Sequence, residues 1–291
     1  MPQSTDKIEI EFTKIEGAGN DFVLIDNRAG LYKFPLTEFA QAVCHRHNGI
    51  GADGLIVLEN SKKADFKMRY INSDGSEGGM CGNGGRCVAH FGLLGNQTKN
   101  SLQFEALDNI YKAERAGQNI RLWMKNPIDL KRNIKIFYQD YELTTDYINT
   151  GAPHTVFFLT DLPGSLYNKL DSMEILPIGK YVRYHPSYAP EGTNVNFIET
   201  SLNRKISIRT YERGVEDETL ACGTGSVASA ILSALKFDWQ SPVEVFTRSK
   251  SKLLVYFKRE SNVITDVILE GPARVVFTGK FNYSLPLKRI V

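Results

Sequence analysis

Short runs rich in β-branched and aromatic residues recur along the chain, and many of them alternate apolar with polar positions. This pattern is typical of β-strands. Helical periodicity is rarer. It predicts a helix over 37–47 with Thr37 as its N-cap, one after each of Cys81 and Cys222, and one within 164–182. The predicted strands span 8–16, 22–26, 54–60, 66–72, 101–107, 119–125, 155–160, 195–200, 206–212, 243–248, 252–258 and 263–270.

This excess of strands predicts an α/β (α+β) chain with mixed or antiparallel sheets around a few helices. An internal duplication is also visible when Cys81 is aligned with Cys222, 141 residues further on (222 − 81). Half a chain length separates the copies, which predicts two similar domains that face each other. The turn-rich stretch 123–133 is the expected crossing between them. The matched pairs are Glu77 and Glu218, Gly82 and Gly223, Gly84 and Gly225, and Ala89 and Ala230.

Composition and charge argue against several classes of function but do not identify one. The 291 residues include 35 basic and 33 acidic side chains, a net charge of +2, so no nucleic acid or anionic membrane partner is indicated. No apolar run reaches the length of a membrane span, and the N-terminus lacks the apolar core of a secretory signal. We therefore expect a cytoplasmic protein. Four cysteines are too few in 291 residues for a disulfide-stabilised scaffold. No two of them have the short spacing of a structural zinc site, so no metal is expected.

Each Cys-Gly pair should lie where the chain enters a helix. Unpaired backbone N–H groups and the positive end of the helix dipole meet there. A thiol in that position gains thiolate character, and glycine N–H groups can approach a carboxylate closely. Cys44 and Cys87, by contrast, fall inside helical patterns and are expected to be buried as small apolar residues.

Two such thiols on opposite sides of a carboxylate ligand would suit one reaction in particular. One thiolate removes the proton from the α-carbon and the opposite thiol delivers a proton to the other face, which inverts the stereocentre. The helix N-termini stabilise the negative charge that develops on the carboxylate oxygens. This chemistry needs neither pyridoxal phosphate nor a metal, so no cofactor is expected.

At this point the chain resembles the diaminopimelate epimerase family. The resemblance rests on "KIEGAGNDFVLID", "INSDGSEGGMCGNGGRC", "TGAPHTVFF", "EGTNVNFIE" and "TYERGVEDETLACGTGSVASA", in that order. It implies two pseudo-symmetric domains, each a curled, mostly antiparallel sheet around a central helix, with the active site in the interdomain cleft. The implied domains are 1–126 with a returning C-terminal strand over 272–291, and 127–271.

The resemblance also implies a reaction and a set of site residues. Cys81 and Cys222 would be the acid and base that convert LL-2,6-diaminopimelate to the meso isomer, in lysine and peptidoglycan precursor biosynthesis. His154 would support a thiol. The remaining residues would hold the amino-acid substrate, by backbone groups at Gly82, Asn83, Gly223 and Thr224 and by the side chains of Asn20, Asn72, Asn194, Glu212 and Arg213.

Two positions depart from the family pattern, and several alternatives stay open. Ala152 stands where the family often has Asn, and Gly54 where many relatives carry Gln, so substrate range is less defined than reaction type. A proline or hydroxyproline racemase would use the same cysteine pair. A non-catalytic protein that binds a small carboxylate is the alternative from another class. A homodimer, and oxidation of the two thiols to a disulfide, are also compatible with the sequence.

Overall fold

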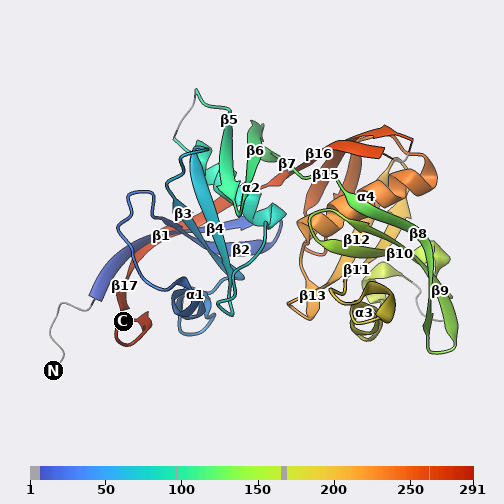
Figure 1. Ribbon diagram of the computed structural model, residues 1–291, viewed down its shortest axis with the longest axis horizontal. Helices are drawn as coiled ribbons and strands as arrows, with labels where there is room; N and C mark the ends of the chain where they lie inside the picture. Colours follow the sequence, from blue (N-terminus) through green and yellow to red (C-terminus); the bar gives the residue numbers. More distant parts are fainter. Residues whose placement is uncertain (1–6, 96–97, 165–168, 262) are drawn as a thin grey trace. The chain divides into compact units, whose positions relative to one another are not determined.

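The structure is a computed structural model that describes residues 7–95, 98–164, 169–261 and 263–291. The chain forms two compact units (Figure 1). Unit 1 contains the chain up to Leu122 together with Ala273–Val291, and unit 2 contains Trp123–Pro272. Within the described ranges, no helix has the length and apolar character needed to cross a lipid bilayer.

In its described residues, unit 1 is a sheet of nine strands with two helices. Hydrogen-bonded neighbours follow the order β18–β17–β1–β2–β3–β4–β5–β6–β7, and all pairs are antiparallel except β2–β3 and β4–β5. The elements are β1 (Lys7–Gly17), β2 (Asn20–Asp26), α1 (Leu36–Cys44), β3 (Gly54–Glu59), β4 (Phe66–Asn72), α2 (Gly82–Leu93), β5 (Ser101–Ala106), β6 (Asn109–Ala116), β7 (Asn119–Trp123), β17 (Arg274–Ser284) and β18 (Arg289–Ile290).

Unit 2 repeats this plan. Its strands follow the order β8–β9–β10–β11–β12–β14–β15–β16, with β13 added to β12, and only β10–β11 and β12–β14 are parallel. The elements are β8 (Ile128–Tyr138), β9 (Tyr141–Asn149), β10 (Pro153–Phe158), η1 (Leu159–Asp161), η2 (Leu170–Ser172), α3 (Ile175–Arg183), η3 (Pro186–Tyr188), β11 (Asn194–Ser201), β12 (Lys205–Glu212), β13 (Asp217–Thr219), α4 (Gly223–Phe237), β14 (Val243–Phe246), β15 (Lys252–Glu260) and β16 (Val263–Pro272).

The two units match element by element. From β1 in unit 1 and β9 in unit 2, successive pairings read antiparallel, parallel, antiparallel, parallel, antiparallel, antiparallel. The helices α1 and α3 lie in the equivalent β2–β3 and β10–β11 connections, and α2 and α4 lie in the equivalent β4–β5 and β12–β14 connections. The predicted two-fold repetition and sheet-dominated α/β fold are therefore confirmed.

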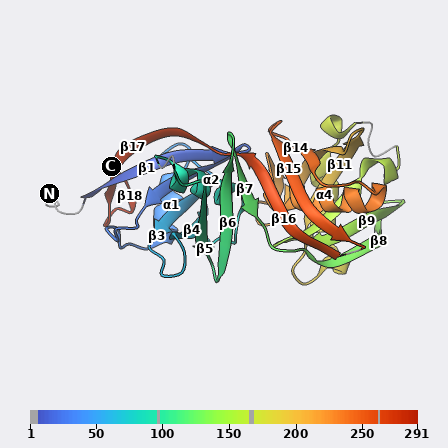
Figure 2. The same cartoon turned by 90° about the horizontal axis from the view of Figure 1, so that it is seen from above.

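The helix that follows each cysteine is the centre of its unit. Nine residues of α2 are buried, and the helix contacts β1, β2 and β17 as well as β5 and β6. A helix can touch both ends of one sheet only if the sheet curls around it. The same holds for α4, which contacts strands from β9 to β16 and is drawn among them in both ribbon views (Figure 2). Small residues allow this close packing. A Cβ at Gly85 would lie 2.4 Å from Met80 Cε.

The other two helices cover the opposite faces of the sheets. On α1, Phe39 is fully buried and packs against Phe34 and Tyr283, with ring centroids 4.4 and 4.9 Å apart. The predicted N-cap of this helix was wrong. Helix α1 begins at Leu36, and Pro35 precedes it with φ fixed at −60° and no side-chain cap.

Some elements escaped prediction. In the region expected to be helical, 164–182, residues 165–168 lie outside the described residues, and the rest forms η2 and most of α3. Strands β6, β8 and β9 were not predicted, whereas β17 lies within the returning C-terminal strand that the family resemblance implied over 272–291. Most positions of β8 are exposed or half-exposed, so its sequence lacks the apolar alternation of a half-buried strand.

Candidate active site

Cys81 and Cys222 are the N-cap residues of the equivalent central helices α2 and α4. Both have extended backbone, with φ and ψ of −93° and 120° at Cys81 and −116° and 114° at Cys222. The predicted position of each thiol at a helix start is confirmed. The first-turn N–H groups of a helix have no partner within it, so each sulfur sits where backbone donors and the positive end of the dipole converge.

In unit 1, Cys81 and the residues that hydrogen-bond around its sulfur form what we call the Cys81 corner. Sγ of Cys81 accepts a hydrogen bond from Gly84 N at 3.5 Å and lies 3.6 Å from Asn20 Oδ1. The Asn20 amide reaches this point from the start of β2. Its Nδ2 donates to Asp53 Oδ2 over 2.5 Å, while its Oδ1 accepts from Asn83 Nδ2 over 3.5 Å.

A buried guanidinium lies under the same corner. Arg86 is fully buried in the second turn of α2 and donates to Gly82 O at 3.2 Å and to Asn83 Oδ1 at 2.8 Å. Desolvation lowers its pKa, and its charge interacts with Cys81 and with Glu16. Arg86, Asn83, Asn20 and Asp53 therefore form one chain of hydrogen bonds that passes beside the Cys81 sulfur.

Charged residues fix Asp53 in turn. Its Oδ2 also accepts from Asp21 N at 3.1 Å, and its Oδ1 accepts from Arg46 at 2.6 Å. Asp21 pairs with the buried Lys14 at 2.6 Å, and Lys14 donates to Gly51 O. Burial alone would raise the pKa of Asp21, but the hydrogen bonds and charges of Lys14 and Arg46 hold it below its ordinary value.

The Cys222 corner in unit 2 is built from other residue types. Cys222 is 8% exposed, and its Sγ lies 3.5 Å from Thr224 Oγ1. That hydroxyl lies 2.9 Å from His154 Nε2, and His154 Nδ1 lies 3.1 Å from Asn196 Nδ2. His154 is completely buried on β10, and desolvation, followed by the charge of Arg213, lowers its pKa to about 3. The ring is therefore neutral at physiological pH and cannot serve as a cationic partner for the thiolate.

The glutamates four residues before each cysteine have a matching role in the two units. Glu77 pairs with Arg69 of β4 at 3.1 Å, and Glu218 forms a two-pronged pair with Arg209 of β12 at 2.6 and 2.7 Å. Strands β4 and β12 are equivalent, so this ion pair was duplicated with the units. Each pair ties the segment before the cysteine to the sheet.

The remaining expected side chains contact protein groups in the structure. Asn72 Nδ2 donates to Ser76 Oγ at 2.9 Å. The amide of Asn194 spans two backbone groups, Pro153 O and Arg213 N, each at 2.9 Å. Glu212 Oε2 accepts from Thr219 Oγ1 at 2.7 Å. Asn194 thus joins the segment before His154 to the end of β12.

Sequence reasoning missed Asp53, Arg86 and Asn196. A signal existed for Arg86, because it is a charged residue inside the first cysteine motif, in the segment predicted to be helical after Cys81. Asp53 comes beside Asn20 only through the parallel pairing of β2 with β3, where Phe22 faces Gly54. Asn196 comes beside His154 through the parallel pairing of β10 with β11. Parallel pairings of distant segments are not visible in local periodicity.

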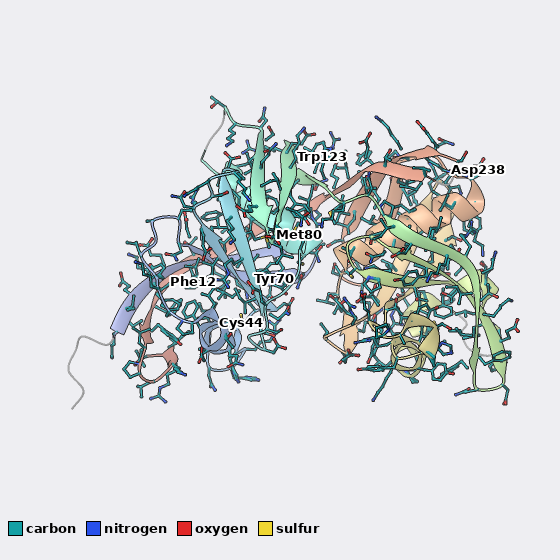
Figure 3. The ribbon with its side chains drawn as sticks, in the orientation of Figure 1. Phe12, Cys44, Tyr70, Met80, Trp123 and Asp238 are labelled. Atoms are coloured by element: carbon teal, nitrogen blue, oxygen red, sulfur yellow. The ribbon has the colours of Figure 1, made fainter. Side chains whose placement is uncertain are left out.

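The structure also places the departures from the family pattern. A Cβ at Gly54 would lie 2.5 Å from the ring of Tyr70, so this ring, labelled in Figure 3, fills the space beside residue 54. Ala152 lies half-buried in the turn between β9 and β10, where its carbonyl accepts from Thr150 N at 3.1 Å. Cys44 and Cys87 are buried inside their helices as expected. Burial raises the pKa of both, to about 12 for Cys44.

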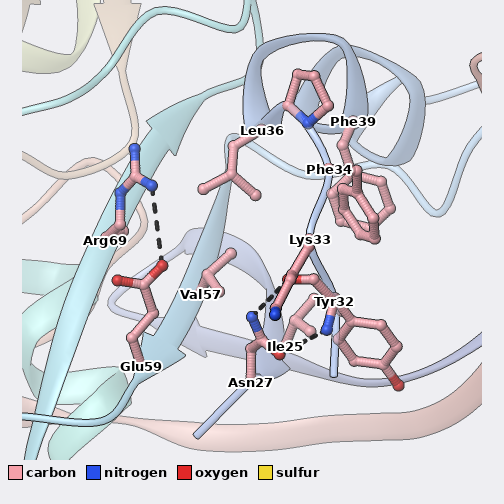
Figure 4. A pocket seen from close by; sticks show the side chains of 11 residues that line it. Ile25, Asn27, Tyr32, Lys33, Phe34, Leu36, Phe39, Val57, Glu59 and Arg69 are labelled. Carbon is pink, nitrogen blue, oxygen red and sulfur yellow. Dashed lines mark hydrogen bonds and ion pairs between the residues drawn. The ribbon is translucent and has the colours of Figure 1, made fainter. Parts of the chain in front are cut away.

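A pocket of about 340 Å³ in unit 1 lies apart from these residues (Figure 4). Several polar residues that line this pocket form ion pairs or hydrogen bonds with one another. Glu59 lies 3.8 Å from Arg69, and Asn27 exchanges two 2.9 Å hydrogen bonds with the backbone of Tyr32. None of the expected site residues lines it. Its lining is Ile25, Asn27, Tyr32, Lys33, Phe34, Pro35, Leu36, Phe39, Val57, Glu59 and Arg69.

Solved structures share this fold at low sequence identity. A phenazine biosynthesis protein of the PhzF family from Bacillus anthracis superposes with a TM-score of 0.71 at 18% identity, covering 94% of this chain and 99% of its own. A hydroxyproline epimerase from Agrobacterium vitis superposes with a TM-score of 0.69 at 14% identity, covering 96% and 94%. The class of the protein is therefore the two-unit α/β fold common to these proteins.

Sequence comparison gives the family within that class. The model of the diaminopimelate epimerase family matches residues 12–125 and 146–276. The diaminopimelate epimerase of Chlorobaculum tepidum is 44% identical over 270 residues, covering 91% of this chain and 98% of its own. That of Flavobacterium psychrophilum is 40% identical over 265 residues, covering 91% and 97%. The chain belongs to the diaminopimelate epimerase family, a family of isomerases.

Proposed function

We propose that this protein converts LL-2,6-diaminopimelate to the meso isomer, with Cys81 and Cys222 as the proton-transferring groups. The observation that carries the proposal is the pair of cysteines at the N-caps of the two equivalent central helices. An inversion at carbon needs a base on one face and an acid of similar strength on the other. Two copies of one thiol site supply that pair, and family membership supports the substrate.

In this mechanism the helix N-termini hold the reacting carboxylate. Backbone N–H groups at Gly82, Asn83, Gly223 and Thr224 are the donors available in the two first turns. As the α-proton leaves, negative charge moves onto the carboxylate oxygens, and these fixed donors stabilise it. The reaction is a proton exchange without change of oxidation state, so the residues of the chain suffice for it. The product would feed lysine and peptidoglycan precursor synthesis.

Proton NMR in deuterated water tests the proposal directly. With LL-diaminopimelate, the native protein should exchange the α-proton for deuterium and produce the meso isomer. Cys81→Ser and Cys222→Ser should each lower that rate by about 100-fold or more, because a serine hydroxyl is a far weaker acid than a thiol. Cys44→Ser supplies the matched control, since that thiol is buried within α1.

L-Proline in the same assay separates the nearest rival, a proline or hydroxyproline racemase. Exchange of proline alone would replace the substrate in this proposal while keeping its chemistry. A third result would identify a non-catalytic carboxylate-binding protein. In that case neither diaminopimelate nor proline exchanges its α-proton, and both cysteine variants still bind diaminopimelate or proline.

A further inference from the structure

We propose that Tyr70 is a substrate-binding residue of the proposed active site, with its phenol hydroxyl donating a hydrogen bond to a carboxylate of the substrate. This inference deepens the proposed function and rests on it. Tyr70 was not among the site residues expected from the sequence. Its position follows from two glycines and from the register of β3 with β4.

The ring of Tyr70 lies between two glycines from different segments of the chain. A Cβ at Gly54, the first residue of β3, would lie 2.5 Å from Tyr70 Cε2. A Cβ at Gly78 would lie 2.3 Å from Cδ1, on the other edge of the ring. By contrast, a Cβ at the neighbouring Gly79 would meet nothing within 4 Å. Both glycines beside the ring therefore allow an approach that any other residue would prevent.

The hydroxyl end of the ring lies on the Gly54 side. A Cβ at Gly54 would be 3.1 Å from Tyr70 Cζ, the carbon that carries the hydroxyl. The atoms nearest to Gly78 are Cδ1, Cε1 and Cγ, which are closer to the root of the side chain. The hydroxyl thus lies beside the space that a side chain at position 54 would enter. Many relatives carry Gln at that position, so this chain has a phenol where those relatives have an amide.

Tyr70 lies on the face of the sheet that α2 covers. It is opposite Ile56 in the antiparallel pair of β3 and β4. A Cβ at Gly84 of α2 would lie 3.3 Å from Ile56 Cδ1 and 3.6 Å from Cys81 Cβ. Since side chains two positions apart in a strand share a face, Asn72 lies on this face as well. The ring is therefore on the same side of the sheet as the Cys81 corner.

Phe22 of β2 supports the ring. Phe22 is fully buried and meets Tyr70 edge-on, with ring centroids 5.8 Å apart and an interplanar angle of 82°. Asn20 is two residues before Phe22 and shares its face of β2. Asn20 and Asn72, both expected to bind substrate, thus lie on the strands at either side of β3, with the phenol beside the start of β3.

The exposure of the Tyr70 ring indicates more than packing. Tyr70 is half-buried, whereas Phe66 on the same face of β4 and its neighbour Phe104 are fully buried core rings. Tyrosine combines an apolar body with a polar tip, which suits a binding surface. A hydroxyl bonds more strongly to an ion than to a neutral group, and diaminopimelate carries a carboxylate at each end. A substrate carboxylate is therefore the expected partner.

Tyr70→Phe removes the hydroxyl and keeps the ring between the two glycines. In the α-proton exchange assay with LL-diaminopimelate, KM should rise about tenfold while kcat stays within about twofold, because the bond is present in both the substrate complex and the transition state. Tyr32→Phe is the matched control, since Tyr32 is also half-buried but lines the separate pocket of Figure 4. It should leave KM unchanged. Equal KM values for native protein and Tyr70→Phe would overturn the proposal.

Exchanging the groups at positions 70 and 54 separates binding from packing. In a Tyr70→Ala background, Gly54→Gln supplies a neutral polar group, and Gly54→Leu supplies a side chain of similar size without one. Both need a slight shift of β3, because a Cβ at Gly54 would lie 2.9 Å from Ile71 O. Only the Gln variant should bring KM back toward the native value. If Leu restored KM equally well, Tyr70 would be a packing residue, and if a swapped variant fails to fold, Tyr70→Phe still decides.

Binding without turnover separates this inference from the proposed function. Calorimetry measures Kd for LL-diaminopimelate in Cys222→Ser protein, with and without Tyr70→Phe, and we expect about tenfold weaker binding without the hydroxyl. That result, with no α-proton exchange by the native protein, would keep the role of Tyr70 and remove the epimerase reaction. Exchange by the native protein with Kd and KM unaffected by Tyr70→Phe would do the reverse. Absence of binding would remove both.

Discussion

Asn20 donates its side-chain amide to Asp53 over 2.5 Å, and this one bond selects which end of the amide faces Cys81. The contact links the first residue of β2 to the residue just before β3. It exists because these two strands pair in parallel, with Phe22 opposite Gly54. A backbone register thus determines the chemistry presented to a sulfur atom.

We expect Asp53→Ala to slow the reaction through Asn20. Without its acceptor the amide is free to rotate, so kcat should fall by about tenfold while KM changes little. In an Asn20→Ala background the same substitution should have no further effect on kcat, because the group through which it acts has gone. Asp26→Ala is the matched control, since Asp26 ends the same strand and pairs with Arg28. Additive losses in the double variant would contradict the role of Asp53.

The buried His154 should make stability depend on acid pH. Burial lowers its pKa from 6.5 to about 3. Between these values the unfolded chain binds a proton that the folded protein does not, so the free energy of unfolding decreases as pH falls. One such group contributes at most about 1.4 kcal/mol per pH unit. Urea midpoints measured in steps below pH 6.5 should fall less steeply for His154→Gln. Identical slopes would show that His154 does not titrate in this way.

The local sequence pattern predicted many of the strands and helices, but few of the hydrogen bonds around the two thiols. Strands such as 66–72 and 206–212 alternate apolar with polar residues and were located nearly to the residue. The helix starts at Cys81 and Cys222 followed from glycines ahead of a small apolar run. Strand β8 was missed because most of its side chains are at least partly exposed, which leaves no apolar stripe to detect.

The partners of the site residues depend on contacts across the sheet. Asp53 is 33 residues from Asn20, and Asn196 is 42 residues from His154. Both pairs come from parallel strands joined through a helical connection, and the sequence contains no local signal for that register. The hydrogen bond between Asn20 and Asp53, and the contact between His154 and Asn196, could therefore be found only in the structure.

The duplicated glutamate–arginine pairs should contribute unequally to stability. The side chains of Arg209 and Glu218 are 9% and 19% exposed, whereas those of Arg69 and Glu77 are 34% and 59% exposed. Glu218→Gln leaves a largely buried guanidinium without its anion and should cost about 3 kcal/mol. Glu77→Gln should cost about 0.5 kcal/mol or less, because exposed ion pairs are screened by water. Chemical denaturation of the two variants compares them, and equal losses would mean that burial does not set their strength.

Gly225 should tolerate no side chain, because α4 passes close to the residues that hold His154. A Cβ at this position would lie 2.5 Å from Asn196 Oδ1 and 3.2 Å from His154 Cε1. Within a helix, alanine is ordinarily favoured over glycine by about 1 kcal/mol. We nevertheless expect Gly225→Ala to lower the free energy of unfolding by about 1–3 kcal/mol, because the buried amide must move off its partners.

Gly164→Ala supplies the comparison, since a Cβ there meets open space and the backbone has no positive φ. It should leave both stability and turnover within error of the native protein. If Asn196 is what Gly225→Ala displaces, kcat should fall together with the loss of stability, because the contacts that run from Asn196 through His154 and Thr224 to the Cys222 sulfur are then disturbed. A stability loss with an unchanged kcat would mean that the helix moves as a whole and carries Thr224 and Cys222 with it.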